Sequence, residues 1–243
     1  MKSRLPIATF INMATVLVGG TIGLLLQQAF PEDVQIIVFQ AIGLATLLIG
    51  LQMGMKLPDG YLLVLILSIT LGGITGELLG IDDMLQRIGD YLKALLNTGN
   101  ARFTEGLVTA TLLFCVGSIT IIGAIEEGIS GKRDLLLVKA TLDGISSVAF
   151  AATYGLGVLF AIFPMLLIQG GLTVTAGRMQ HFFSEKILNL INAIGGLLII
   201  GIGINLLNIG RVNVENLLPG LVVILPVAHL WDRWFPKTRD DGS

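Results

Sequence analysis

Residues 32–43 read EDVQIIVFQAIG, and residues 184–195 read SEKILNLINAIG. Both stretches begin with acidic or helix-capping residues, run through apolar ones, place an amide side chain (Gln40 or Asn192) and end on Ala-Ile-Gly. If five membrane-crossing helices separate the two copies, they have opposite orientations in the membrane. Inverted repeats of this kind are typical of secondary transporters, whose binding site lies at the repeat interface near the middle of the bilayer.

The composition places the chain among integral membrane proteins. Of its 243 residues, 53% are hydrophobic and 13% are charged, whereas a soluble domain carries about 25% charged residues. The mean hydropathy is +0.85, and the net charge of −2 gives no reason to expect a nucleic-acid partner. Cys115 is the single cysteine, and His181 and His229 are far apart in the sequence, so no intramolecular disulfide, no His-based metal site and no cofactor are expected.

The apolar stretches predict an all-α membrane protein with eight membrane-crossing helices, each of about 20 residues. These helices are expected at residues 5–28, 33–55, 61–80, 104–126, 134–154, 157–177, 186–207 and 214–231. The division of 134–177 rests on the break Tyr154-Gly155-Leu156-Gly157. A single re-entrant segment is the alternative interpretation of that region.

The repeat divides this single polytopic domain, residues 1–243, into successive parts. Three helices in 5–80 form the first repeat, 104–154 holds a central helix pair, and 157–231 forms the second repeat ahead of a tail at 232–243. The segment 82–97 differs from the others because its apolar residues fall on one face and its charged residues elsewhere. This pattern is typical of an amphipathic helix that lies in the membrane interface.

The distribution of positive charge tests the helix count. With eight crossings, both ends of the chain share one side, and that side holds eleven of the fifteen Lys and Arg residues. The positive-inside rule then places both termini, and with them the tail, in the cytoplasm. The richer side carries Lys2, Arg4, Lys56, Lys132, Arg133, Lys139, Arg178, Lys186, Arg233, Lys237 and Arg239, and the other side carries Arg87, Lys93, Arg102 and Arg211.

A second sequence echo lies between the two repeats. Residues 107–112 read LVTATL and residues 137–142 read LVKATL, each near the start of one helix of the central pair. Because consecutive crossing helices run antiparallel, a two-fold axis in the membrane plane would pass near this pair. The alternative is a chance match between helices rich in Leu, Ala and Val.

Asp143 is the main candidate for a functional residue. It lies nine residues into the predicted helix 134–154, about 13 Å along the helix axis and near the middle of the bilayer. A charge there costs at least ~2.5–3.5 kcal/mol, so the carboxylate must face protein or water. Lys139 precedes it by one helical turn and can pair with it. The pair is interpreted either as a cation or proton site or as a structural contact between helices.

Hydroxyl and amide side chains in the same helices could supply further ligands. Gly117, with hydroxyl residues after it, can mark a broken helix whose free carbonyls bind small cations, although small residues also allow close helix packing. Intramembrane amides more often join helices than bind substrate. The predicted ion- or substrate-binding set comprises Asp143, Lys139, Ser118, Thr120, Ser146, Ser147, Gln40 and Asn192.

Residues 107–131, LVTATLLFCVGSITIIGAIEEGISG, and the following run KATLDG at 139–144 resemble the core of the bacterial "domain of unknown function 554" inner-membrane family. The stretch TFIN at 9–12, the glycines Gly19 and Gly23, and Pro164 with Gln169-Gly170 are similar to other recurring positions of that family. Ser118 departs from it, because the family is expected to have proline there. The resemblance implies a multi-pass protein of the bacterial inner membrane and implies no established substrate.

These observations favour a small secondary transporter or channel for a small cation or a cation-coupled solute. The alternative is a non-transporting membrane scaffold, and an enzyme is not expected because no nucleophile–base set is present. The expected partners are the lipid bilayer, a small ion or solute and, from glycine pairs such as Gly50/Gly54, a second copy of the chain. A water-filled cavity at Asp143 would favour the transporter, and a dry, fully paired Lys139–Asp143 contact would favour the scaffold.

Overall fold

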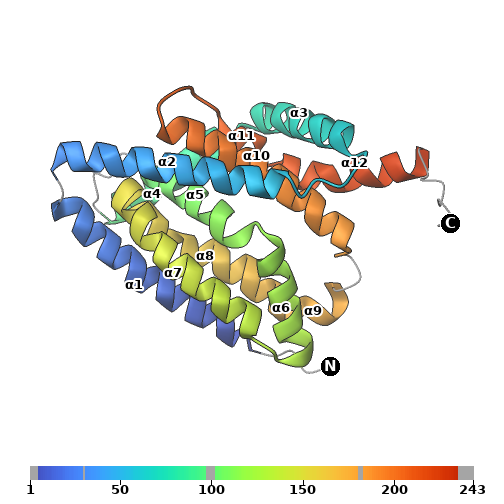
Figure 1. Cartoon of the computed structure of the whole chain (residues 1–243), viewed down its shortest axis with the longest axis horizontal. Coiled ribbons are helices and arrows are strands. Elements are labelled where there is room, and N and C mark those ends of the chain that lie inside the picture. Colours follow the sequence, from blue (N-terminus) through green and yellow to red (C-terminus); the bar gives the residue numbers. More distant parts are fainter. Residues whose placement is uncertain (1–4, 30, 97–101, 180–182, 235–243) are drawn as a thin grey trace.

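A computed structural model describes residues 5–29, 31–96, 102–179 and 183–234, so most of the predicted tail 232–243 lies outside it. Within these ranges all regular elements are helical, as expected, and they lie side by side (Figure 1). The α-helices are α1 Ile7–Ala29, α2 Glu32–Gly54, α3 Leu62–Leu79, α4 Ile81–Leu96, α5 Phe103–Cys115, α6 Ser118–Ser130, α7 Asp134–Tyr154, α8 Ile162–Met165, α9 Gly171–Met179, α10 Glu185–Leu206, α11 Val214–Leu217 and α12 Gly220–Trp234.

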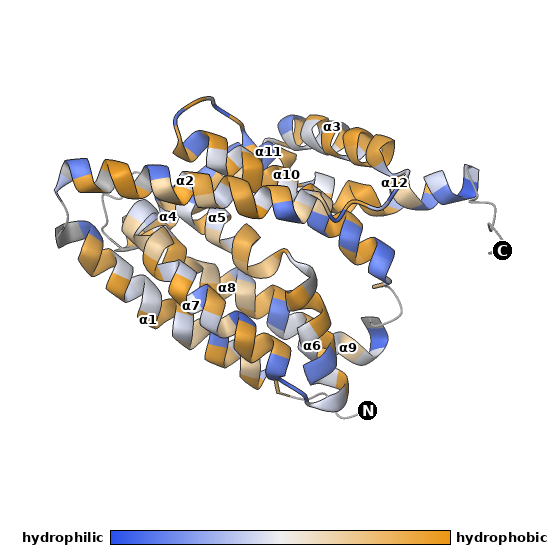
Figure 2. Cartoon of the chain, viewed as in Figure 1, coloured by the Kyte–Doolittle hydropathy of each residue, from blue (hydrophilic) through white to orange (hydrophobic). Residues whose placement is uncertain are grey.

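The lengths and compositions of the described helices fit a multi-pass membrane protein. Six helical segments are long and apolar enough to cross a membrane, and the bent pair α5–α6 makes a seventh when it is taken as one crossing. Figure 2 shows hydrophobic residues along these helices, with hydrophilic residues gathered toward the helix ends. One of the six segments, Asp134–Arg178, is 45 residues long and contains two of the predicted helices.

This long segment reverses direction at Gly155. The glycine has φ 75°, a left-handed conformation that glycine adopts readily, and a 3₁₀ turn follows at Gly155–Ala161. The side-chain nitrogen of Asn12 donates hydrogen bonds both to Asp143 at 2.8 Å and to Gln169 at 3.3 Å. A straight helix would hold those two residues about 39 Å apart, so α7 and the α8–α9 segment must fold back on one another (Figure 1).

Helices α1 and α7 are in backbone contact and run in the same direction. A methyl group at Gly19 would lie 2.1 Å from the carbonyl oxygen of Gly144, and one at Gly23 would lie 2.3 Å from the carbonyl oxygen of Val148. The contact points advance together along both chains, which makes the pair parallel. Small residues permit this close approach, as is common between membrane helices.

Two other helix pairs are antiparallel and equally close. In the pair α2–α10, a methyl group at Gly50 would lie 2.7 Å from the carbonyl oxygen of Gly196, and one at Gly203 would lie 2.8 Å from Leu47. In the pair α3–α12, a methyl group at Gly72 would lie 2.3 Å from the backbone nitrogen of Gly220. The α2–α10 pair brings together the two similar stretches of sequence, 32–43 with Gln40 and 184–195 with Asn192.

The region predicted as one helix over 104–126 is broken in the structure. Helix α5 ends at Cys115, Val116 and Gly117 have extended backbones, and α6 begins at Ser118. The two helices meet at an angle of 58°. The family resemblance leads one to expect proline at position 118, where this chain has Ser118. The helix is broken without that proline, because the extended backbone at Val116 and Gly117 already ends α5. The predicted amphipathic helix 82–97 is present as α4, one residue earlier at each end.

The α1–α7 contact predicts that Gly19→Ala destabilises the protein by about 1–3 kcal/mol, because the added methyl group overpacks a backbone contact. Gly54→Ala is the matched control, since Gly54 is also helical and nothing lies within 4 Å of the position its methyl group would take. Thermal unfolding in detergent, followed by tryptophan fluorescence, would compare the two. Equal melting temperatures for both variants would contradict the contact.

Candidate functional site

An ion pair between Lys139 and Asp143 lies at the centre of the candidate site. Both residues belong to α7 and are one helical turn apart, so their side chains leave the helix on the same face. The ammonium nitrogen is 2.7 Å from one carboxylate oxygen and 2.9 Å from the other. Lys139 is 8% exposed and Asp143 is 5% exposed. The two charges are therefore removed from solvent and neutralise one another.

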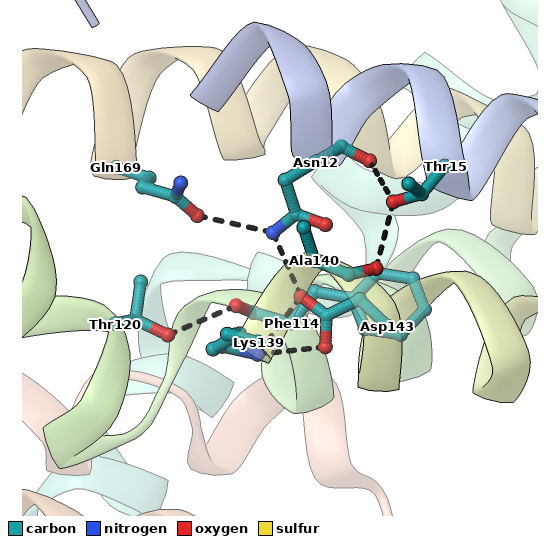
Figure 3. A network of polar contacts seen from close by, with 8 residues as sticks. All are labelled: Asn12, Thr15, Phe114, Thr120, Lys139, Ala140, Asp143 and Gln169. Carbon is teal, nitrogen blue, oxygen red and sulfur yellow. Dashed lines mark hydrogen bonds and ion pairs between the residues drawn. The ribbon is translucent and has the colours of Figure 1, made fainter. Parts of the chain in front are cut away.

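Two amide side chains from other helices enclose this pair (Figure 3). Asn12 of α1 donates one hydrogen to Asp143 and the other to the carbonyl oxygen of Gln169, which follows α8. The hydroxyl of Thr15 donates to the carbonyl oxygen of Ala140 at 2.8 Å and so fixes the register of α1 against α7. The site thus depends on three separate segments of the chain.

Two buried side-chain atoms of Asn12 and Gln169 make no hydrogen bond within the protein. Among the described residues, the carbonyl oxygen of the Asn12 side chain and the amide nitrogen of the Gln169 side chain are buried and have no hydrogen-bond partner. One can accept a hydrogen bond and the other can donate one. Buried polar groups are nearly always satisfied by protein, water or ligand, so these two atoms point to a further occupant beside the ion pair.

The broken helix lies next to the ion pair. Thr120 of α6 donates a hydrogen bond at 3.2 Å to the carbonyl oxygen of Phe114 in α5 and so spans the break (Figure 3). Helix ends expose amides and carbonyls that have no partner within the helix. An apolar hollow of about 470 Å³ adjoins the break.

The structure brings together only part of the predicted set. Asp143, Lys139 and Thr120 belong to the network of Figure 3, whereas the side chain of Ser118 lies outside the described part of the chain. Ser147 is buried and donates its hydroxyl hydrogen to the carbonyl oxygen of Gly144 at 2.7 Å. It therefore contributes to the packing of α7, and Ser146 beside it is half-buried.

The amides that the repeat pairs occupy unequal environments. Gln40 lies on the exposed face of α2, and Asn192 is buried in α10. Asn12 contacts the ion pair, and Gln169 reaches it only through Asn12; neither belongs to the predicted binding set. Their positions in the family resemblance were the available signal for a role at the site. In the described ranges no cluster of three or more His, Cys, Asp or Glu residues could hold a metal ion.

A polar vestibule lies at the end of the molecule where α7 reverses. Its volume is about 520 Å³. Asn213 donates a hydrogen bond to the Asp82 carboxylate at 3.0 Å. This bond is the main reason why the pKa of the Asp82 carboxyl lies below its usual value. Tyr154, which also lines the vestibule, lies about 16 Å along α7 from Asp143. The charged residues that line the vestibule are Asp82, Asp90, Arg102, Glu105, Arg211 and Glu215.

The buried pair predicts a non-additive double-mutant cycle. Asp143→Leu alone strands a buried ammonium group and should cost about 3–5 kcal/mol of stability, as should Lys139→Met alone through the stranded carboxylate. The double variant should cost much less than the sum, because an apolar pair of similar volume replaces both charges. Unfolding in mixed micelles would measure the cycle, and additive costs would show that the two side chains do not interact.

Comparison with known proteins agrees with this architecture. Residues 7–229 match the family described as "Protein of unknown function (DUF554)". The chain is 30% identical to "Uncharacterized membrane protein YdfK" of Bacillus subtilis (strain 168), over 91% of this chain and 96% of that protein. It is also 30% identical to "Uncharacterized protein YqgA" of Escherichia coli (strain K12), over 94% and 99% of the two chains. No solved structure matches the chain. The family resemblance noted in the sequence is confirmed, and the chain belongs to the DUF554 membrane-protein family.

Proposed function

We propose that the protein is a small secondary transporter for a small cation or a cation-coupled solute, with Asp143 as its central binding group. The observation that carries the proposal is the buried Lys139–Asp143 pair, held by Asn12 and Gln169 beside a broken helix. Ionisable residues inside membrane helices are costly and are usually retained for function. Broken helices at the same depth are typical of transporter sites.

We propose eight crossings with both termini in the cytoplasm of a bacterial cell whose inner membrane holds the protein. The contacts between helix ends support this topology. Tyr61, Lys186 and Asp232 form one hydrogen-bonded cluster, and all three lie at helix ends that eight crossings place on the cytoplasmic side. Asp82 and Asn213, which the same topology places on the opposite side, are also bonded to one another.

The packing of the helices is also what the proposed inverted repeat requires. Exchanging the two repeats exchanges α1 with α8–α9 and exchanges α7 with α5–α6. The close pair α1–α7 should therefore have a counterpart between α6 and α9. Such a contact exists, because a methyl group at Gly128 would lie 2.2 Å from the carbonyl oxygen of Thr173. The pairs α2–α10 and α3–α12 each join a helix to its own repeat mate, as helices on either side of a two-fold axis do.

Lys139 gives the proposed site a simple exchange chemistry. When no external cation is bound, the ammonium group of Lys139 neutralises Asp143. An entering cation would take over the carboxylate, and Lys139 would have to move away or lose its proton. Either response keeps the buried charge low, which an apolar environment demands. Binding of the cation and release of Lys139 would thereby be coupled.

A membrane scaffold is the second candidate function. The pair is closed in the structure, with both partners nearly inaccessible and each carboxylate oxygen bonded to Lys139. A contact of this kind can serve helix packing alone. The transporter is preferred because Asn12 and Gln169 keep unpartnered atoms next to the pair, which a purely structural contact gives no reason to retain.

Transport is tested with proteoliposomes on a supported membrane that are challenged with jumps of Na⁺, K⁺, H⁺ and amino acids. We expect wild-type current with at least one of these solutes and loss of that current in Asp143→Asn. Asp134→Asn, on the exposed first turn of the same helix, should retain it. If Asp143→Asn does not fold, Lys139→Arg keeps the positive charge and should shift the concentration that gives half-maximal current. No current for any of these solutes would favour the scaffold.

The topology is tested with single cysteines in a Cys115→Ala background. Asn208→Cys and Asp59→Cys both lie on exposed turns between helices. We expect a membrane-impermeant maleimide to label Asn208→Cys in intact cells and to label Asp59→Cys only after the membrane is permeabilised. Labelling of both positions in intact cells would rule out the proposed arrangement.

A further inference from the structure

Buried polar atoms without partners continue from the central pair toward the turn between α6 and α7. Among the described residues, the hydroxyl of Thr9 and one carboxylate oxygen of Glu127 lack hydrogen-bond partners, as do the side-chain atoms of Asn12 and Gln169 described above. All four residues are 0% exposed. Neither Thr9 nor Glu127 belongs to the binding set predicted from the sequence.

These four residues form one contiguous set. The other carboxylate oxygen of Glu127 accepts a hydrogen bond at 3.0 Å from the backbone nitrogen of Ala8, the residue before Thr9. A methyl group at Gly170 would lie 3.7 Å from the methyl carbon of Thr9, so Thr9 adjoins the segment that carries Gln169. Thr9 and Asn12 are three residues apart on α1 and share one face of it.

Thr9 lacks the hydrogen bond to its own helix that several other threonines of the apolar helices make. The hydroxyls of Thr21 and Thr141, for example, donate to the carbonyl oxygen four residues earlier, which is the usual way a helix satisfies a threonine. The Thr9 hydroxyl makes no such bond to the carbonyl oxygen of Leu5 and has no other partner among the described residues. It is therefore available to a group from outside its own helix.

The set reaches solvent at its Glu127 end. Arg133, in the turn before α7, donates a hydrogen bond at 2.9 Å to the same carboxylate oxygen of Glu127 that contacts Ala8. The side chain of Arg133 is 39% exposed, whereas that of Glu127 is 1% exposed. Buried hydroxyl, amide and carboxylate groups are thus found between a partly solvated arginine and Asp143.

We infer that Glu127, Thr9, Asn12 and Gln169 line a file of water molecules that connects Asp143 with the α6–α7 end of the protein. Water can accept from the Gln169 nitrogen, donate to the Glu127 and Asn12 oxygens and do both at Thr9, so it satisfies every unpartnered group. The file itself does not require transport. Its use as the cytoplasmic route for a proton or small cation rests on the proposed function.

The first test measures whether removal of the Thr9 hydroxyl raises or lowers the melting temperature. In a dry site, Thr9→Val removes an unsatisfied buried hydroxyl and should raise the melting temperature. In a hydrated file, the same change strands the neighbouring water and should lower it. Thr46→Val is the matched control, because Thr46 is equally buried and unpartnered but lies in α2, away from the file. A rise for both variants would overturn the inference.

The second test measures water access directly. In a Cys115→Ala background, Thr9→Cys is compared with Ala8→Cys, which has the same depth and burial but packs against the apolar Ala124 and Leu136. Inside-out vesicles are treated with 2-aminoethyl methanethiosulfonate, which reacts with hydrated thiolates. We expect Thr9→Cys to react at least tenfold faster.

Equal rates at the two positions, fast or slow, would contradict a file confined to the Thr9 face. Neither test uses a transported solute. A protein that passes both tests but carries no current would keep the water file and lose the proposed function.

Discussion

The backbone contact between α1 and α7 is the constraint on which the rest of the structure depends. Gly19 and Gly23 let the two helices approach until carbonyl oxygens of α7 lie where methyl groups would otherwise be. This approach sets Asn12 beside Asp143 and allows Thr15 to bond to the backbone of α7. Charged side chains within the membrane are tolerated when they face other protein groups. The α1–α7 contact supplies such a group to Asp143, namely the side chain of Asn12.

A second consequence of that contact concerns α8 and α9. Because Asn12 binds both Asp143 and Gln169, the chain must turn back after α7, which it does at Gly155, and lay the next segment against α1. Three segments then surround one ion pair, and the break between α5 and α6 adjoins it. Several buried polar groups are thereby gathered around the ion pair, while many exposed positions of the helices are large and apolar.

The two ends of this interior differ in character. Toward Gly155, the vestibule has charged walls, and Tyr154 in its lining lies about 16 Å along α7 from Asp143. Toward the α6–α7 turn, the buried polar side chains are those of Asn12, Thr9 and Glu127. A protein that exposes its centre alternately to two sides needs different barriers on those sides, and this asymmetry is consistent with such a cycle. The closed ion pair by itself is what a scaffold would have, and the unpartnered atoms of Asn12 and Gln169 are the observation that favours the proposed transporter.

Hydropathy, helical periodicity and one-turn spacing act locally, so they were enough to predict the membrane class, most helix boundaries, the amphipathic α4 and the Lys139–Asp143 pairing. The family followed from residues 107–144 and their neighbours. Local patterns could not predict that Asn12 joins Gln169 to the pair, that Gln40 is exposed, or that Glu127 is buried. Those outcomes depend on which helix faces meet, and that is set by glycine contacts between segments far apart in the chain.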